Sequence, residues 1–315
     1  RACHCAWCFC RSLCADKFHE YVPTLHAVWF VKPEVIVVSG GINFRFNIKM
    51  LTNLKFITLL GLCVLLSVTS MAQTLDVLVF SKTEGFRHNS IEAGVSAIQS
   101  LGEQHDFGVV ATEDASVFTT ENLQNYDVVM FLNTTGNVLD NAQQDAFERF
   151  IQQGGGFVGV HAASDTEYEW PWYGQLVGAY FESHPRIQEA TILVEDTTNV
   201  STKHLPVRWH RTDEWYNYSD NPRGKVHVLA RLDESSYRGG NMGDDHPIAW
   251  MHEFDGGRSW YTGGGHTKES YEEPAFLVHI LGGIRYAAGV DGDASAGVGG
   301  DGSGGVDEPV SDDGQ

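Results

Sequence analysis

The sequence predicts an α/β domain with a mainly parallel sheet between residues 73 and 289. Short, almost continuously apolar segments, such as residues 75–80, alternate with segments of helical pattern and are separated by polar or glycine-rich turns. Strands that are apolar along their whole length are buried on both faces, which is typical of a parallel sheet with helices on each side.

Four strands and two helices are expected in the first half of this segment. Asn89 to Glu92 form a capping signal for a helix that runs to about residue 101, and Asp140 with Gln143 caps a second helix that ends at glycines 154–156. The apolar face of the second helix consists of Ala142, Ala146, Phe147 and Phe150. The expected strands are residues 75–80, 107–111, 126–132 and 157–161.

The second half has longer polar loops between its expected strands. Pro274 is expected to open a last helix that runs to about residue 286 and packs on the sheet. We expect the strands of this half to extend the same sheet, and they are residues 187–194, 226–231, 248–254 and 259–262.

The segments before and after the domain have a different composition. Residues 50–72 have a charged start at Lys55, an apolar core at 56–68 and a small-residue cleavage site at 70–72, so they are expected to be a signal peptide. Residues 1–49 are then a non-native upstream extension, and we prefer this interpretation to a zinc knuckle formed by their closely spaced cysteines. Residues 290–315, rich in Gly, Asp and Ser, are expected to be a disordered tail or a linker to a further C-terminal domain.

This organisation predicts a secreted or periplasmic protein with no stable membrane anchor. All six cysteines precede residue 73, so the mature chain would have no disulfide and would depend on its core for stability. The chain has a net charge of −20, of which residues 1–72 contribute +4 and residues 290–315 contribute −7, which leaves −17 for the domain. Such a charge disfavours nucleic acid as a partner and suits a neutral or cationic small molecule.

Candidate functional residues follow the expected strands, because ligands of open parallel sheets bind beyond the carboxyl ends of the strands. The segment Gly159 to Ala163 has small residues on both sides of His161, which is typical of a sharp strand-to-helix turn that presents a functional side chain. Tight strand–helix packing would need the same small residues, so both interpretations stay open. We predict that His161 and His266 face one cleft, with His88, Asp165, His210 and Asp213 nearby.

Five segments of the domain resemble the trehalose-utilisation (ThuA-like) family. The residues that carry the resemblance are 83–88 (TEGFRH), 154–161 (GGGFVGVH), 210–216 (HRTDEWY), 246–250 (HPIAW) and 257–266 (GRSWYTGGGH). The resemblance implies the class I glutamine amidotransferase-like fold, a flavodoxin-like three-layer sandwich, and a role in carbohydrate metabolism.

The strand-end positions and the resemblance together give a set of expected site residues. Amidotransferases of this fold use a cysteine at the turn that His161 occupies, so Cys-dependent glutaminase chemistry is not expected here. The residues expected to be catalytic are His161, His266, Asp165 and Asp213. The residues expected to bind a small-molecule carbohydrate are Glu84, Arg87, His88, His210, Glu214, Trp215 and Trp172.

Three kinds of function stay open from the sequence. The first is an exported enzyme that acts on trehalose or a related glycoside or keto-sugar through a His/Asp-rich cleft. The second is a non-catalytic carbohydrate-binding or accessory domain of a larger exported enzyme. The third is a metal site, in which His161, His184, His210 and His266 with Asp165 or Asp213 would bind a divalent ion such as zinc.

Overall fold

The structure is a computed structural model that describes residues 75–290. The expected upstream extension, signal peptide and glycine-rich tail lie outside the described residues and stay predictions. Among the described residues, no helix combines the length and the apolar character that a membrane span requires.

Within residues 75–290, nine strands form one sheet in the order β2-β1-β3-β4-β11-β10-β9-β6-β7. The first five strands in this order are parallel, and each later strand is antiparallel to its neighbour. Two short strands pair separately. The strands are β1 (Asp76–Phe80), β2 (Gly108–Thr112), β3 (Val128–Leu132), β4 (Gly156–Val160), β5 (Phe181–Ser183), β6 (Gln188–Val194), β7 (Arg208–Asp213), β8 (Asn217–Tyr218), β9 (His227–Asp233), β10 (His246–Phe254) and β11 (Gly257–Thr262).

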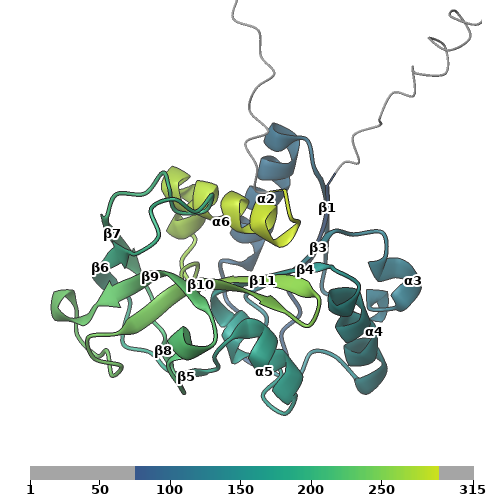
Figure 1. Cartoon of the computed structure of the whole chain (residues 1–315), viewed down its shortest axis with the longest axis horizontal. Helices are drawn as coiled ribbons and strands as arrows, with labels where there is room; N and C mark the ends of the chain where they lie inside the picture. The colour runs from purple at the N-terminus through teal and green to yellow at the C-terminus, as the bar shows by residue number, and fades with distance from the viewer. Residues whose placement is uncertain (1–74, 291–315) are drawn as a thin grey trace, which may run out of the picture. The chain divides into compact units, whose positions relative to one another are not determined.

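Helices cover both faces of the sheet and make a three-layer α/β domain (Figure 1). In the figure, α2 and α6 lie on one side of the sheet, and α3, α4 and α5 lie on the other. The α-helices are α2 (Ile91–His105), α3 (Thr120–Leu123), α4 (Asn141–Gln152), α5 (Pro171–Val177) and α6 (Pro274–Ala287). The expected α/β fold with its large, mainly parallel sheet is therefore confirmed.

The helix starts agree with the sequence in one case and differ in another. Asp140 and Gln143 form the expected capping box at α4. At α2 the expected box is wrong, because the N-cap Ser90 makes no capping hydrogen bond and instead donates to the carbonyl of Gly265. On the predicted apolar face of α4, Ala142 is exposed.

The antiparallel half of the sheet curls back toward α6. The pairing of β9 with β10 contains register shifts, which increase local twist. At the edge strand β7, the Arg211 guanidinium lies between the rings of Trp209 and Phe276, at 4.8 and 4.2 Å from their centroids. Its Nε donates to Glu273, the N-cap of α6, at 2.6 Å. This contact brings the end of β7 to the loop that follows β11.

Candidate functional site

Three histidines and one glutamate converge at the carboxyl edge of the parallel strands. His88 lies in the loop after β1, His161 follows β4, Glu214 follows β7 and His266 lies in the loop after β11. One potential ligand atom from each residue lies within 4.8 Å of all the others. His161 Nε2 is 3.2 Å from His266 Nδ1, and Glu214 Oε2 is 3.1 Å from His266 Nδ1 and 3.6 Å from His161 Nε2.

His161 occupies a sharp turn at the end of β4. Its φ is +50°, in the left-handed region that non-glycine residues rarely adopt. A Cβ at Gly159 would lie 2.9 Å from the Tyr261 ring and 3.2 Å from Ala163, so the turn requires small residues at these positions. The His161 Nδ1 lies 2.8 Å from the carbonyl oxygen of Gly263 and can only donate to it, which leaves Nε2 to face the cluster. The expected strand-to-helix turn is therefore present, and its side chain is directed by a backbone hydrogen bond.

Asp213 lies behind the cluster and holds its loops together. The carboxylate is fully buried. Its Oδ1 accepts the backbone N–H groups of Glu214 and His266 at 3.0 and 3.1 Å. Its Oδ2 accepts the N–H of Gly265 at 2.8 Å and the hydroxyl of Ser270 at 2.9 Å. Asp213 therefore orients two members of the cluster, and its own oxygens have hydrogen-bond donors.

Two members of the cluster, Glu214 and His88, have strongly shifted pKa values. Burial by itself raises the pKa of Glu214, but its hydrogen bonds with His161 and His266 outweigh burial and lower the pKa to about 2. Burial and the neighbouring imidazoles lower the pKa of His88 to about 3. The buried Nδ1 of His88 has no hydrogen-bond partner among the described residues.

Further groups surround the cluster. Asp165 ends the 3-10 turn that His161 begins and accepts a hydrogen bond of 2.6 Å from the Tyr168 hydroxyl. Burial raises the pKa of Asp165 in spite of that bond. The second oxygen of Glu214 lies 3.0 Å from Nδ1 of His184, which the β5–β8 pairing brings to the site.

Aromatic rings complete the surroundings. The ring of the buried Tyr216 lies 4.1 Å from that of His161, and the half-buried Phe181 lies 4.3 Å from Tyr216. Phe86, which is 66% exposed, contacts the edge of His88 at 4.9 Å. The sequence analysis did not name these three aromatic residues as site residues. It named His184 only as one of several possible metal ligands.

Comparison with known proteins gives the family. The family described as ThuA, trehalose utilisation, matches residues 76–287. The chain belongs to the ThuA family. A crystal structure of a ThuA-like protein from Bacteroides uniformis is 25% identical, with a TM-score of 0.59, over 70% of this chain and 94% of that one. A ThuA-like protein from Parabacteroides merdae is 20% identical, with a TM-score of 0.58, over 69% of this chain and 90% of that one. No curated protein sequence matches the chain.

In this ThuA domain, several of the predicted substrate-binding residues have other surroundings. Glu84 pairs with Lys82, and Arg87 pairs with two exposed glutamates. His210 alternates with Asp213 along β7, is exposed and contacts the Thr191 hydroxyl, so it does not lie with the cluster.

The two predicted tryptophans also contact other parts of the ThuA domain. Trp215 is fully buried and donates to the carbonyl of Gln188. Trp172 donates to Asp255 at the β10–β11 turn. The alternating burial along β7 places His210, and contacts between distant loops place the two tryptophans. Neither effect can be deduced from the local sequence pattern.

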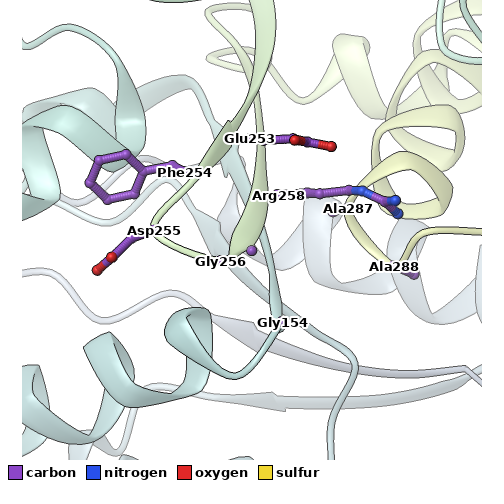
Figure 2. A pocket seen from close by; sticks show the side chains of 9 residues that line it. Gly154, Glu253, Phe254, Asp255, Gly256, Arg258, Ala287 and Ala288 are labelled. Carbon is purple, nitrogen blue, oxygen red and sulfur yellow. The ribbon is translucent and has the colours of Figure 1, made fainter.

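A surface pocket lies at the opposite end of β11 (Figure 2). It encloses about 450 Å³ and is formed by the β10–β11 turn and the end of α6, with Glu253, Asp255 and Arg258 among its polar residues. Its lining includes none of the predicted site residues within the described part of the chain. The carboxyl edge of the ThuA domain is therefore the better candidate site.

Proposed function

We propose that this ThuA domain is an enzyme that acts on a neutral carbohydrate, trehalose or a related glycoside or keto-sugar, at the site of His161, Glu214 and His266. The observation that carries the proposal is the convergence of these three side chains, from three separate strand ends, to within 3.6 Å. Ligands of open α/β sheets bind at this edge.

The arrangement supports proton transfer. The His161 Nδ1–H donates to the carbonyl of Gly263, so the proton of that nitrogen is not available to His266. The short contact between His161 Nε2 and His266 Nδ1 is then a hydrogen bond in which one proton lies between the two nitrogens. Glu214 is ionised at neutral pH and favours that proton. A pair of imidazoles that shares one proton beside a carboxylate can both accept and donate a proton to a substrate hydroxyl or carbonyl.

The charges favour a substrate without phosphate. Two arginines near the cluster in sequence are already paired: Arg211 with Asp213 and Glu273, and Arg87 with Glu92 and Glu113. A phosphate would need Arg, Lys or a helix N-terminus as a partner. A neutral sugar needs only hydrogen bonds and an apolar ring face, which Phe86 and Phe181 can supply.

The same residues favour an enzyme over a non-catalytic binding domain. Trp172 and Trp215, which would stack on a sugar in a binding module, are held elsewhere by hydrogen bonds to Asp255 and Gln188. The groups at the site are instead buried and titratable, and His161 has strained backbone. Such strain costs free energy and tends to occur at functional sites.

The test is turnover of defined sugars by the full chain. Trehalose, its keto derivative and trehalose phosphate are incubated with the wild type, His161→Asn and the control His210→Gln, and products are measured by mass spectrometry. Asn tolerates the positive φ of residue 161, so the fold should persist while the imidazole is lost. We expect the neutral sugars to react, His161→Asn to lose about 10²-fold or more in rate, and His210→Gln to keep its rate.

Two outcomes would contradict the proposal. Binding of the neutral sugars without any product would support the carbohydrate-binding alternative. Turnover that persists in His161→Asn would place the chemistry at another site.

A further inference from the structure

We infer that His88, His161, Glu214 and His266 together bind one divalent metal ion of the zinc class. The inference deepens the proposed function, because it names a cofactor for the same site and rests on the same cluster. Each residue comes from a different strand end, so the site exists only in the folded domain.

The distances among three of the four ligand atoms fit a tetrahedral ion. Zinc–nitrogen and zinc–oxygen bonds of about 2.0–2.1 Å at tetrahedral angles place neighbouring ligand atoms about 3.3 Å apart. The three measured separations among His161 Nε2, His266 Nδ1 and Glu214 Oε2 are 3.1, 3.2 and 3.6 Å. Without a cation, His161 Nε2 and His266 Nδ1 need the shared proton described above, and a bound ion would replace that proton.

The supporting hydrogen bonds also fit. Ligating histidines usually donate their other ring nitrogen to a carbonyl or a carboxylate, which fixes the tautomer. His161 makes this bond to Gly263 at 2.8 Å. The other oxygen of Glu214 contacts His184 at 3.0 Å, and Asp213 fixes the backbone of both Glu214 and His266.

His88 supplies an observation of its own. Its ring packs edge-on against His161 and His266, with centroids 5.0 Å from each. Its side chain is buried, and its Nδ1 has no partner in residues 75–290. Buried polar groups are rarely left without a partner, and a metal would supply one.

The ligand types select the class of ion. Three imidazoles and one carboxylate suit Zn²⁺ and neighbouring transition metals, whereas Mg²⁺ and Ca²⁺ prefer oxygen ligands throughout. When bound at a catalytic site, such an ion polarises a carbonyl or lowers the pKa of water. The residues of the chain would hold it, and Glu214 would offset part of its charge.

The test measures metal binding without any sugar. The full chain is stripped with a chelator, dialysed and titrated with Zn²⁺ in competition with a chromophoric chelator, and Co²⁺ is added as a spectroscopic probe. We expect one Zn²⁺ per chain, a Co²⁺ visible spectrum with nitrogen ligation, and much weaker binding of Mg²⁺. His266→Gln and Glu214→Gln should each lower the affinity for Zn²⁺ at least 10-fold, and the buried control His279→Gln should not.

The possible outcomes separate this inference from the proposed function. Absence of stoichiometric Zn²⁺ binding by the wild type, or equal losses in His266→Gln and His279→Gln, would overturn the metal site. Sugar turnover that survives complete chelation would overturn the role of the ion as a cofactor and would leave the enzyme proposal standing. Zn²⁺ binding without turnover would support the metal site and contradict the enzyme.

Discussion

Asp213→Asn should destabilise the domain and loosen the cluster, although the substitution changes hardly any volume. The carboxylate accepts four hydrogen bonds, two on each oxygen, and lies 3.4 Å from Arg211 Nη1. Asn has one acceptor oxygen and one NH₂ donor. If the oxygen keeps the N–H groups of Glu214 and His266, the NH₂ faces the N–H of Gly265.

The magnitude follows from these contacts. The Ser270 hydroxyl can rotate and accept from the NH₂, so that hydrogen bond survives in reversed form. The Gly265 N–H loses its acceptor, and a hydrogen bond to a charged group is worth about 1.5–3 kcal/mol. Arg211 loses one of its two anionic partners but keeps Glu273 at 2.6 Å. Together these changes predict a loss of about 3 kcal/mol in the free energy of unfolding.

The assay is urea unfolding in the presence of a chelator, so that no metal contributes to stability. Ser270→Ala is the matched control, because it removes one of the four hydrogen bonds to the carboxylate, together with the contact to the Thr267 hydroxyl, and leaves the carboxylate in place; it should cost about 1 kcal/mol. An Asp213→Asn variant that loses no more than Ser270→Ala would refute the idea that this carboxylate organises the site. Unchanged Zn²⁺ affinity in Asp213→Asn would refute its positioning role in the metal site.

Two further predictions concern the α6 layer. Gly282→Ala should destabilise the domain by about 2 kcal/mol in urea unfolding, because a Cβ there would lie 2.3 Å from the Ser201 Cα, although alanine normally favours a helix. The control Gly224→Ala has open space around its Cβ and should not destabilise the domain. Equal effects of the two substitutions would contradict the packing argument. Burial lowers the pKa of His279 to about 3, so below pH 6.5 the unfolded chain gains a proton that the folded chain does not, and stability falls toward pH 3. His279→Gln should reduce the slope of unfolding free energy against pH by about 1.4 kcal/mol per pH unit at pH 5, and an unchanged slope would contradict a neutral buried imidazole.

The strands of the parallel half were predictable because their pattern is local. Strands such as Val128–Leu132 are buried on both faces, and their continuous apolar sequence predicts this burial. The edge strand β7 was not predicted, because its inward positions are Trp209, Arg211 and Asp213 and only one of these is apolar. Burial of a paired arginine and aspartate depends on partners far along the chain, which no local pattern contains.

The candidate site, like the sheet, was predictable only where it depends on the parallel strands. His161 and His266 follow strands of the parallel part of the sheet, so the rule that ligands bind at strand ends was enough to place them together. Glu214 was assigned only to substrate binding, and His184 was named only as one of several histidines. Both depend on the curl of the antiparallel half and on the small β5–β8 pairing, which position loops that are distant in sequence.

The curl of the sheet therefore has a consequence for chemistry. In a flat sheet with this strand order, the end of β7 would lie four strands away from β11, at about 4.8 Å per strand, and Glu214 could not contact His266. The contacts of Arg211 with Phe276 and Glu273 hold β7 against α6 and close that distance. Through Asp213, the same contacts reach the backbone of His266. The packing of the edge strand on α6 and the geometry of the cluster are thus one structural feature, and substitutions at this packing should alter the site without touching its four members.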